Sequence, residues 1–323
     1  MKLKTKAFIN SIRLRRLLGE KVFCKDWQVE DLRYLSAGEL LDRLHDLGLE
    51  LDKEELARSF EMVDSPEGLC ELLCAGFSQD RYERAYLLLF ELWRKLSGRQ
   101  TPSIFGDELD YRIFLYDSDE FFNDDLIQTA LFTVEELLQK NVDAGATPKE
   151  AFLAFQKYLA HDLESFLYDY IHEQIENRNL IYAGELIESF YNCMSKPLWF
   201  DFLFAYLYLF SDIENSNDII KMVVNELLLH PDFDLQMEVL RFMSRGGDGH
   251  LFLKLARTTL AMVGNEGELK DLLEIAAEYY RRFDRVELEQ SILYLMQKRL
   301  ENGVSRPVDR QDPDLAIFSN YLV

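Results

Sequence analysis

The stretch TPKEAFLAFQKYLAHDLESFLYDY, residues 147–170, decides the fold class. Thr147 and Glu150 have the spacing of a capping box, and Pro148 stands at the first helical position, where a missing N–H does no harm. The apolar side chains that follow recur at intervals of three and four residues, the period of one helix face: Phe152, Phe155, Leu159, Leu163, Phe166 and Tyr170. We therefore predict one helix with a buried face through all of these positions.

Similar signals mark helices earlier in the chain. Ser36 and Glu39 form another capping box, followed by leucines at helical spacing, and Gly48 is expected to stop that helix. Further helices are expected to start at Ser65-Pro66 and to cover residues 81–96 and 126–139. With few prolines and glycines between them, these segments predict an all-α protein.

Helix starts recur with a rhythm after residue 179. Alternate starts lie about 35 residues apart, which is typical of helix–turn–helix units stacked side by side. The expected starts are near Asn179, Pro197, Ser216, Pro231, Gly249, Glu266 and Arg285. This period resembles that of tetratricopeptide-like α-solenoids, so we predict a solenoid of helical hairpins, with an irregular helical bundle as the alternative.

One segment carries conflicting signals. LWFDFLFAYLYLF, residues 198–210, has an aromatic side chain at every second position, which is a strand signal. Pro197 and the helical neighbours favour a buried helix with its aromatic side chains in the core or at the floor of a groove. The segment contains Asp201 and falls short of the about 20 apolar residues that a membrane-spanning helix needs. We therefore expect no transmembrane segment.

The chain divides most clearly at residues 98–106, GRQTPSIFG, where glycine, proline and small hydroxyl residues gather. We predict a small N-terminal helical domain over 1–97, a linker over 98–106, the solenoid-like domain over 107–302, and a C-terminal tail over 303–323. The tail ends in apolar residues, which need a groove on this chain or on a partner.

Charge is unevenly distributed. The chain has a net charge of −22, yet residues 1–25 carry +7, with Glu20 as their one acid, so the remainder carries −29. A body this acidic attracts basic or amphipathic protein partners and disfavours nucleic acid. The basic segment is the candidate interaction surface, made of Lys2, Lys4, Lys6, Arg13, Arg15, Arg16, Lys21 and Lys25.

This basic segment has two interpretations. It could bind a phosphate or an anionic lipid, in which case the protein is a nucleic-acid or anionic-membrane adaptor. Alternatively, it is a helix whose leucines dock on the body while its charges offset nearby acids, including the acidic loop at residues 117–120. Residues 35–56 resemble the SAP-type helix–loop–helix of DNA-binding proteins, but the acids between its two helices would repel phosphate.

The sequence carries no nucleotide-binding motif, no nucleophile elbow and no zinc-protease motif. Asp42 with His45, and Asp169 with His172, have the spacing of helical metal ligands, which keeps a metal-dependent enzyme as an alternative. With 58 acids in 323 residues, about one such pair is expected by chance. We therefore assign no catalytic residue, cofactor or metal ligand.

These observations predict a non-enzymatic interaction protein, a scaffold or chaperone-like adaptor that uses an acidic helical surface. The four cysteines lack the spacing of a disulfide framework or a C-x-x-C motif. Free thiols and the lack of a secretory signal predict a cytoplasmic location.

Overall fold

The computed structural model describes residues 5–118 and 125–322, and within these ranges every regular element is a helix. The predicted all-α class is therefore confirmed. One isolated bridge, between Asn265 and Pro307, is the only β-type pairing in this part of the chain.

The helices belong to two compact units. Unit 1 runs to Leu167 and includes Asn192–Ser195, and unit 2 comprises Tyr168–Tyr191 and the residues from Lys196 onward.

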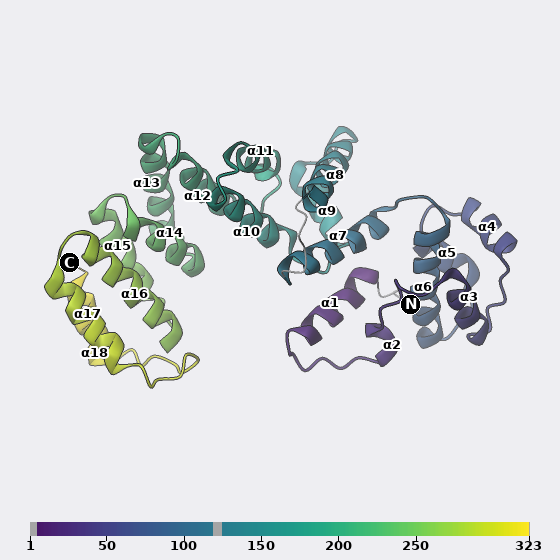
Figure 1. The fold of residues 1–323 in the computed structure, drawn as a ribbon, viewed down its shortest axis with the longest axis horizontal. Helices are drawn as coiled ribbons and strands as arrows, with labels where there is room; N and C mark the ends of the chain where they lie inside the picture. Colours follow the sequence, from purple (N-terminus) through teal and green to yellow (C-terminus); the bar gives the residue numbers. More distant parts are fainter. Residues whose placement is uncertain (1–4, 119–124, 323) are drawn as a thin grey trace. The chain divides into compact units, whose positions relative to one another are not determined.

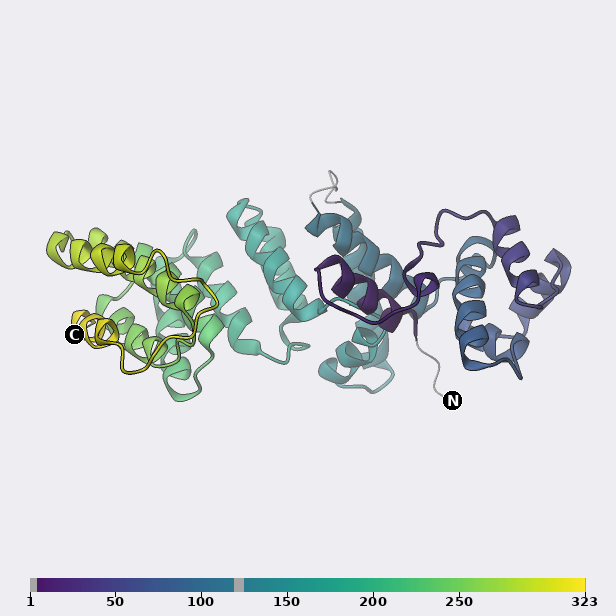
Figure 2. The same ribbon diagram turned by 90° about the horizontal axis from the view of Figure 1, so that it is seen from below.

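Unit 1 is organised around the long helix α6, against which α3 and α5 pack. The ring of Phe60 on α4 meets the ring of Trp93 on α6 edge to face, with centroids 5.3 Å apart, which is a favoured aromatic geometry. Helix α1 packs on α7, α7 on α8 and α8 on α9 (Figure 2). The bounds are α1 Lys6–Leu17, α2 Asp26–Val29, α3 Ala37–Asp46, α4 Lys53–Glu61, α5 Pro66–Leu73, α6 Gln79–Leu96, α7 Pro102–Asp117, α8 Asp125–Asp143 and α9 Pro148–Gln156.

Local capping chemistry sets these boundaries where the sequence predicted it. The Ser36 hydroxyl accepts from the Glu39 amide at 3.2 Å, and the Glu39 carboxylate accepts from the Ser36 amide at 2.8 Å. Thr147 and Glu150 make the same reciprocal pair at the start of α9. Gly48 adopts φ +73° just after α3, where a residue without Cβ closes the helix at no steric cost.

The helix predicted through residues 147–170 is interrupted, so that prediction is wrong in one respect. All six apolar residues are buried, but α9 ends at Gln156 and α10 begins at Leu163, running to Glu176. The Asp110 carboxylate accepts the backbone amides of Ala160 and His161, at 2.8 Å and 3.1 Å. Because these amides bond a buried carboxylate from α7, they are not available to a continuous helical ladder.

The segment predicted as a linker, residues 98–106, is half helical. Thr101 caps α7, and its hydroxyl accepts from the Ile104 amide at 3.3 Å, with Pro102 at the first helical position. Residues 102–106 therefore form the first turns of a mostly buried helix. The division between the two units falls instead inside α10, after Leu167.

Unit 2 continues with helices that pack on their neighbours along the chain. In addition, α13 contacts α15 and α14 contacts α16 (Figure 1). The bounds are α11 Leu180–Tyr191, α12 Pro197–Tyr208, α13 Ile213–Leu229, α14 Phe233–Arg245, α15 Gly249–Leu260, α16 Glu266–Arg282, α17 Val286–Lys298 and α18 Pro313–Tyr321. These starts lie close to those expected from the sequence, and the tetratricopeptide-like stacking of the helices stays a prediction.

The aromatic segment at 198–210 is the helix α12, as predicted. Phe200, Phe202, Leu203 and Ala205 are buried within unit 2. The strand signal fails because the aromatic side chains are spread over several faces of the helix, of which one is buried against α11 and α13 while Phe204, Tyr206 and Tyr208 stay half-exposed.

The C-terminal tail docks on its own chain. Helix α18 packs on α15 and α17, and Phe318 and Leu322 are buried. Arg299, only 5% exposed, makes two hydrogen bonds to the Glu266 carboxylate, at 2.5 Å and 2.9 Å, and also pairs with Asp312 at 2.6 Å. These bonds fix the chain that leads into α18 and hold the pKa of the Glu266 carboxyl below its ordinary value, against the effect of desolvation.

Candidate interaction groove and the basic N-terminal segment

Unit 2 contains a groove of about 640 Å³, a volume typical of ligand-binding clefts. Its walls come from α10, α12, α13 and α14 and from the turn before α15. The lining includes the side chains of His172, Glu176, Phe202, Tyr206, Ile213, Asp218, Lys221, Glu238, Arg241, Phe242 and Arg245.

The floor of this groove is aromatic. The Phe242 ring on α14 lies 5.7 Å from that of Phe202 and 5.5 Å from that of Tyr206, in edge-to-face contact with each. His172 stacks on Tyr206, with ring centroids 4.9 Å apart and planes 9° from parallel. Tyr206 and Phe242 are half-buried, so they offer apolar surface to a ligand while their packing holds them in place.

The Tyr206 hydroxyl is fixed at the edge of the floor, where it donates to the Glu176 carboxylate. Burial, followed by the neighbouring Glu176, raises the pKa of Tyr206 to about 12. The hydroxyl is therefore protonated across the physiological range and acts as a hydrogen-bond donor, with its ring oriented by that bond.

The rim of the groove carries both signs of charge. Arg241 pairs with Glu238 at 2.9 Å, and Arg245 pairs with Glu278 at 3.6 Å. The remaining charged lining includes exposed Asp218 and Lys221 on α13. Exposed pairs of this kind contribute little to stability, and they are available to exchange partners with an incoming segment.

The glycine-rich turn that follows α14, residues 246–249, leads directly into α15. Asp248 caps α15, and its carboxylate accepts from the amides of His250 and Leu251 at 2.8 Å and 3.2 Å. A carboxylate of the chain itself thus occupies the positive end of this helix, where a bound anion would otherwise be favoured.

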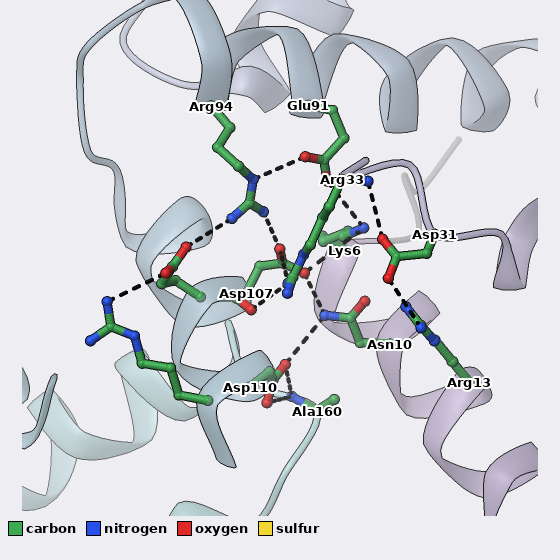
Figure 3. A network of polar contacts seen from close by, with 12 residues as sticks. Lys6, Asn10, Arg13, Asp31, Arg33, Glu91, Arg94, Asp107, Asp110 and Ala160 are labelled. Carbon is green, nitrogen blue, oxygen red and sulfur yellow. Dashed lines mark hydrogen bonds and ion pairs between the residues drawn. The ribbon is translucent and has the colours of Figure 1, made fainter. Parts of the chain in front are cut away.

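The structure separates the members of the predicted basic surface. Lys2 and Lys4 lie outside the described residues. Lys6 is largely buried: its Nζ lies 3.6 Å from the Glu91 carboxylate and 3.8 Å from that of Asp107. This lysine belongs to an internal polar network of unit 1 (Figure 3), rather than to an open surface.

Asp107, only 1% exposed, is the centre of that network. Its carboxylate accepts from Asn10 at 2.6 Å and from Arg33 at 2.5 Å, and it pairs with Arg94 (Figure 3). Desolvation alone would raise the pKa of Asp107, but Lys6, Arg33 and Arg94 together hold it well below its ordinary value. The carboxylate is therefore charged in the folded protein at neutral pH.

Asp110 joins a third segment to the network. Besides the Ala160 and His161 amides, it pairs with the His161 ring nitrogen Nδ1 at 2.9 Å. It also accepts from the Asn10 side-chain amide at 3.4 Å (Figure 3). Helix α1, helix α7 and the break before α10 thus meet at two buried carboxylates.

Three other basic side chains pair with acids of unit 1. Arg13 lies 3.2 Å from Asp31, Arg15 lies 2.7 Å from Glu20, and Lys25 pairs with Asp80. Arg16 and Lys21 are exposed at the end of α1 and in the loop that follows it.

Helix α1 docks through its first turns. Ala7, Ile9 and Ile12 are buried, whereas Leu17 and Leu18 are 59% and 80% exposed. A docked basic helix was one of the two interpretations of this segment, but its buried contacts come from Ala7, Ile9 and Ile12, with Leu14 only half-buried. Leu14 and Leu17 line a small cleft together with Tyr111 and Phe114 of α7, and Leu18 follows the last residue of the helix.

The Asp–His pairs show no convergence on a common site. Asp42 and His45 are on α3 in unit 1, where His45 lies 3.7 Å from Glu50, while His172 belongs to the aromatic floor of the groove in unit 2. In residues 5–118 and 125–322, no group of three or more His, Cys, Asp or Glu side chains could hold a metal ion.

The sequence predicted α12 as an aromatic helix with its side chains in the core or at the floor of a groove, but it did not indicate which other helices line that groove. Phe242 and Ile213 come from α14 and α13, at spacings from Tyr206 that no local motif encodes. The one available signal was the excess of aromatic residues on α12, beyond what a single buried helix face requires.

Comparison with known proteins gives no match to a family model, a curated protein or a solved structure. In the described part of the chain, no helix combines the length and the apolar character needed to cross a bilayer.

Proposed function

We propose that this protein is a non-enzymatic interaction module, a scaffold or adaptor, and that the groove of unit 2 holds a short segment of a partner protein. The aromatic floor of Phe202, Tyr206 and Phe242 carries the proposal. A concave apolar floor between helices, with charged side chains around it, is the arrangement that receives an amphipathic segment.

The size of the groove indicates a modest affinity. Fully burying a large apolar side chain is worth about 1.5–3 kcal/mol, so two anchors contribute about 3–6 kcal/mol before the costs of association are subtracted. Additional contacts along the rim bring the expected dissociation constant to about 1–100 μM.

Charge favours a partner with basic side chains next to its apolar anchors. The chain has a net charge of −22, and the groove is lined by four carboxylates, Glu176, Asp218, Glu238 and Asp248, against three cations, Lys221, Arg241 and Arg245. At close range this small excess of carboxylates favours a basic segment, and the association should weaken as salt is added. The four free cysteines fit a reducing compartment, and the proposal places the protein in the cytoplasm.

The test is selection of binding peptides from a random displayed library by the full chain, followed by affinity measurement with two matched variants. Ile213 is 60% exposed at the first position of α13 and lines the groove. Val286 is 60% exposed at the first position of α17, away from the groove lining. Because aspartate is well tolerated in a first helical turn, Ile213→Asp and Val286→Asp should both fold.

We expect selected peptides to carry apolar anchors with basic neighbours, and Ile213→Asp to weaken their binding at least about tenfold, the loss of one good apolar contact. Val286→Asp should bind like the unmodified chain. The groove is refuted as the interaction site if the library yields no binding peptide, or if the selected peptides bind Ile213→Asp with the same affinity as the unmodified chain.

A further inference from the structure

Unit 1 exposes an apolar tip where α1 ends, made of Leu17, Leu18 and Phe23. Leu17, Leu18 and Phe23 are 59%, 80% and 98% exposed, all within seven residues of chain. Single exposed apolar residues are ordinary on a protein surface, but three of them on one turn and its loop, interleaved with basic residues, form a distinct feature.

The backbone of this tip is held without using these three side chains. Gly19 adopts φ +81°, the Glu20 amide donates to the Arg15 carbonyl at 3.0 Å, and the Gly19 amide donates to the Arg16 carbonyl at 3.1 Å. This is a Schellman turn, in which an apolar contact normally joins the residues at positions 15 and 20. Here the Arg15–Glu20 ion pair takes its place. Leu17 borders a small cleft beside Tyr111 and Phe114 but keeps more than half of its surface exposed, as does Leu18.

The rest of α1 is fixed to unit 1. Ile9 and Ile12 are buried, and Lys6 and Asn10 enter the network around Asp107. The loop that follows the helix runs along the margin of unit 1 before it reaches α2 (Figure 1). The tip is therefore a projection on an anchored helix.

Basic residues surround the apolar tip. Residues 15–25 carry four basic side chains and one acid, a charge of +3. Glu20 faces Arg15 and Asp80 faces Lys25, while Arg16 and Lys21 are exposed beside the apolar side chains. The acidic remainder of the chain is screened at separations beyond about 8 Å in physiological salt, so the local positive charge governs contact at the tip.

We propose that residues 15–25 form a membrane-contact site, which inserts Leu17, Leu18 and Phe23 into the surface of an anionic bilayer while Arg16 and Lys21 meet lipid headgroups. Apolar insertion combined with basic residues at headgroup level is the combination that holds peripheral proteins on such membranes. A nucleic acid would match the charges, but its phosphates offer nothing to the leucines. The proposal is independent of the groove in unit 2.

The experiment is co-sedimentation of the full chain with phosphatidylcholine vesicles that contain about a third phosphatidylserine, compared with pure phosphatidylcholine vesicles. Leu18→Asp/Phe23→Asp removes the apolar contact, and Arg16→Glu/Lys21→Glu removes the positive charge. The matched control is Met62→Asp/Phe132→Asp, which changes two apolar residues of unit 1 that are 70% and 59% exposed.

We expect binding to the anionic vesicles, and about tenfold or greater loss of the partition coefficient in each tip variant, with the control unchanged. Unchanged helical circular dichroism of the variants ensures that lost binding reflects the tip. The proposal is overturned if the chain does not bind anionic vesicles at low salt, or if it binds neutral vesicles equally well. It is also overturned if Leu18→Asp/Phe23→Asp binds anionic vesicles as strongly as the unmodified chain. Binding of DNA that needs Arg16 and Lys21 but not Phe23 would also overturn it.

Discussion

Replacing Asp107 with asparagine should severely destabilise unit 1. The carboxylate is 1% exposed and faces three cations, Lys6, Arg33 and Arg94, at distances that include 2.5 Å to Arg33 and 3.8 Å to Lys6. The variant keeps the shape of the side chain but removes its charge. Glu91, which pairs with Lys6 and Arg94, is then the buried carboxylate that remains to balance these cations. Removing one member of a buried ion pair costs about 3–5 kcal/mol, and we expect a loss of the free energy of unfolding in that range.

Urea unfolding followed by tryptophan fluorescence measures this loss, in a Trp199→Phe background that leaves the two tryptophans of unit 1 as reporters. Glu108→Gln is the control, because Glu108 pairs with Arg94 at 3.1 Å but is 39% exposed. Its removal should cost less than about 1 kcal/mol. A loss for Asp107→Asn that is equal to that of the control would refute the view that this network stabilises unit 1.

The same substitution predicts a dependence on pH. The folded-state pKa of Asp107 lies well below its unfolded value, so its contribution is fully present above about pH 4 and is lost as pH falls and the unfolded chain takes up the proton first. The difference in stability between the original chain and Asp107→Asn should therefore shrink below pH 4. A difference that stays constant down to pH 3 would contradict the assignment of a charged Asp107.

Three further predictions concern single contacts. Gly106→Ala should destabilise unit 1 by about 1–3 kcal/mol, because a Cβ would lie 2.6 Å from the Tyr158 carbonyl oxygen. Thermal melts measure this loss, and an unchanged melting temperature would show that the backbone at Tyr158 moves away from α7 easily. Arg299→Ala should remove the cation that bonds the buried Glu266 carboxylate and loosen the tail, so trypsin should cleave after Arg310 at least about tenfold faster. Protection equal to that of the original chain would contradict this role. Asp248→Ala should remove the N-cap of α15 and lower the free energy of unfolding, measured in urea, by about 0.5–2 kcal/mol. An unchanged free energy of unfolding would mean that water satisfies these backbone amides equally well.

The helices themselves were predictable because their signals are local. Ser36, Ser65 and Thr147 each bond an amide three residues ahead, and each begins a helix where expected. Pro197 opens α12 despite the strand-like alternation that follows it. Capping bonds and apolar periodicity depend on a few residues of one segment, so one sequence is enough to reveal them.

The break before α10 was not predictable in this way. The apolar period runs unbroken from Phe152 to Tyr170, and the break is imposed by Asp110, about 50 residues earlier in the chain. The buried Asp110 carboxylate needs hydrogen-bond donors, and the amides of Ala160 and His161 supply them at the expense of a continuous helix. Nothing in residues 157–162 alone indicates this demand.

The candidate sites show the same division. The basic character of residues 1–25 is plain in the sequence, but the sequence does not show which of these charged side chains are buried and which are exposed. Lys6 is enclosed beside Asp107, whereas Arg16 and Lys21 stay exposed beside Phe23. Burial depends on which helix face meets α7, and this is settled by packing across the unit.

The sequence by itself therefore determined the all-α class, the positions of most helix starts and the segregation of charge, since each of these follows from composition and short-range chemistry. The tertiary structure decided which carboxylates are buried, where a continuous helical pattern breaks, and that residues of α12, α13 and α14 together line one groove. The physical reason is that burial and hydrogen-bond satisfaction are properties of segments distant in sequence, and their cost is fixed only when those segments meet.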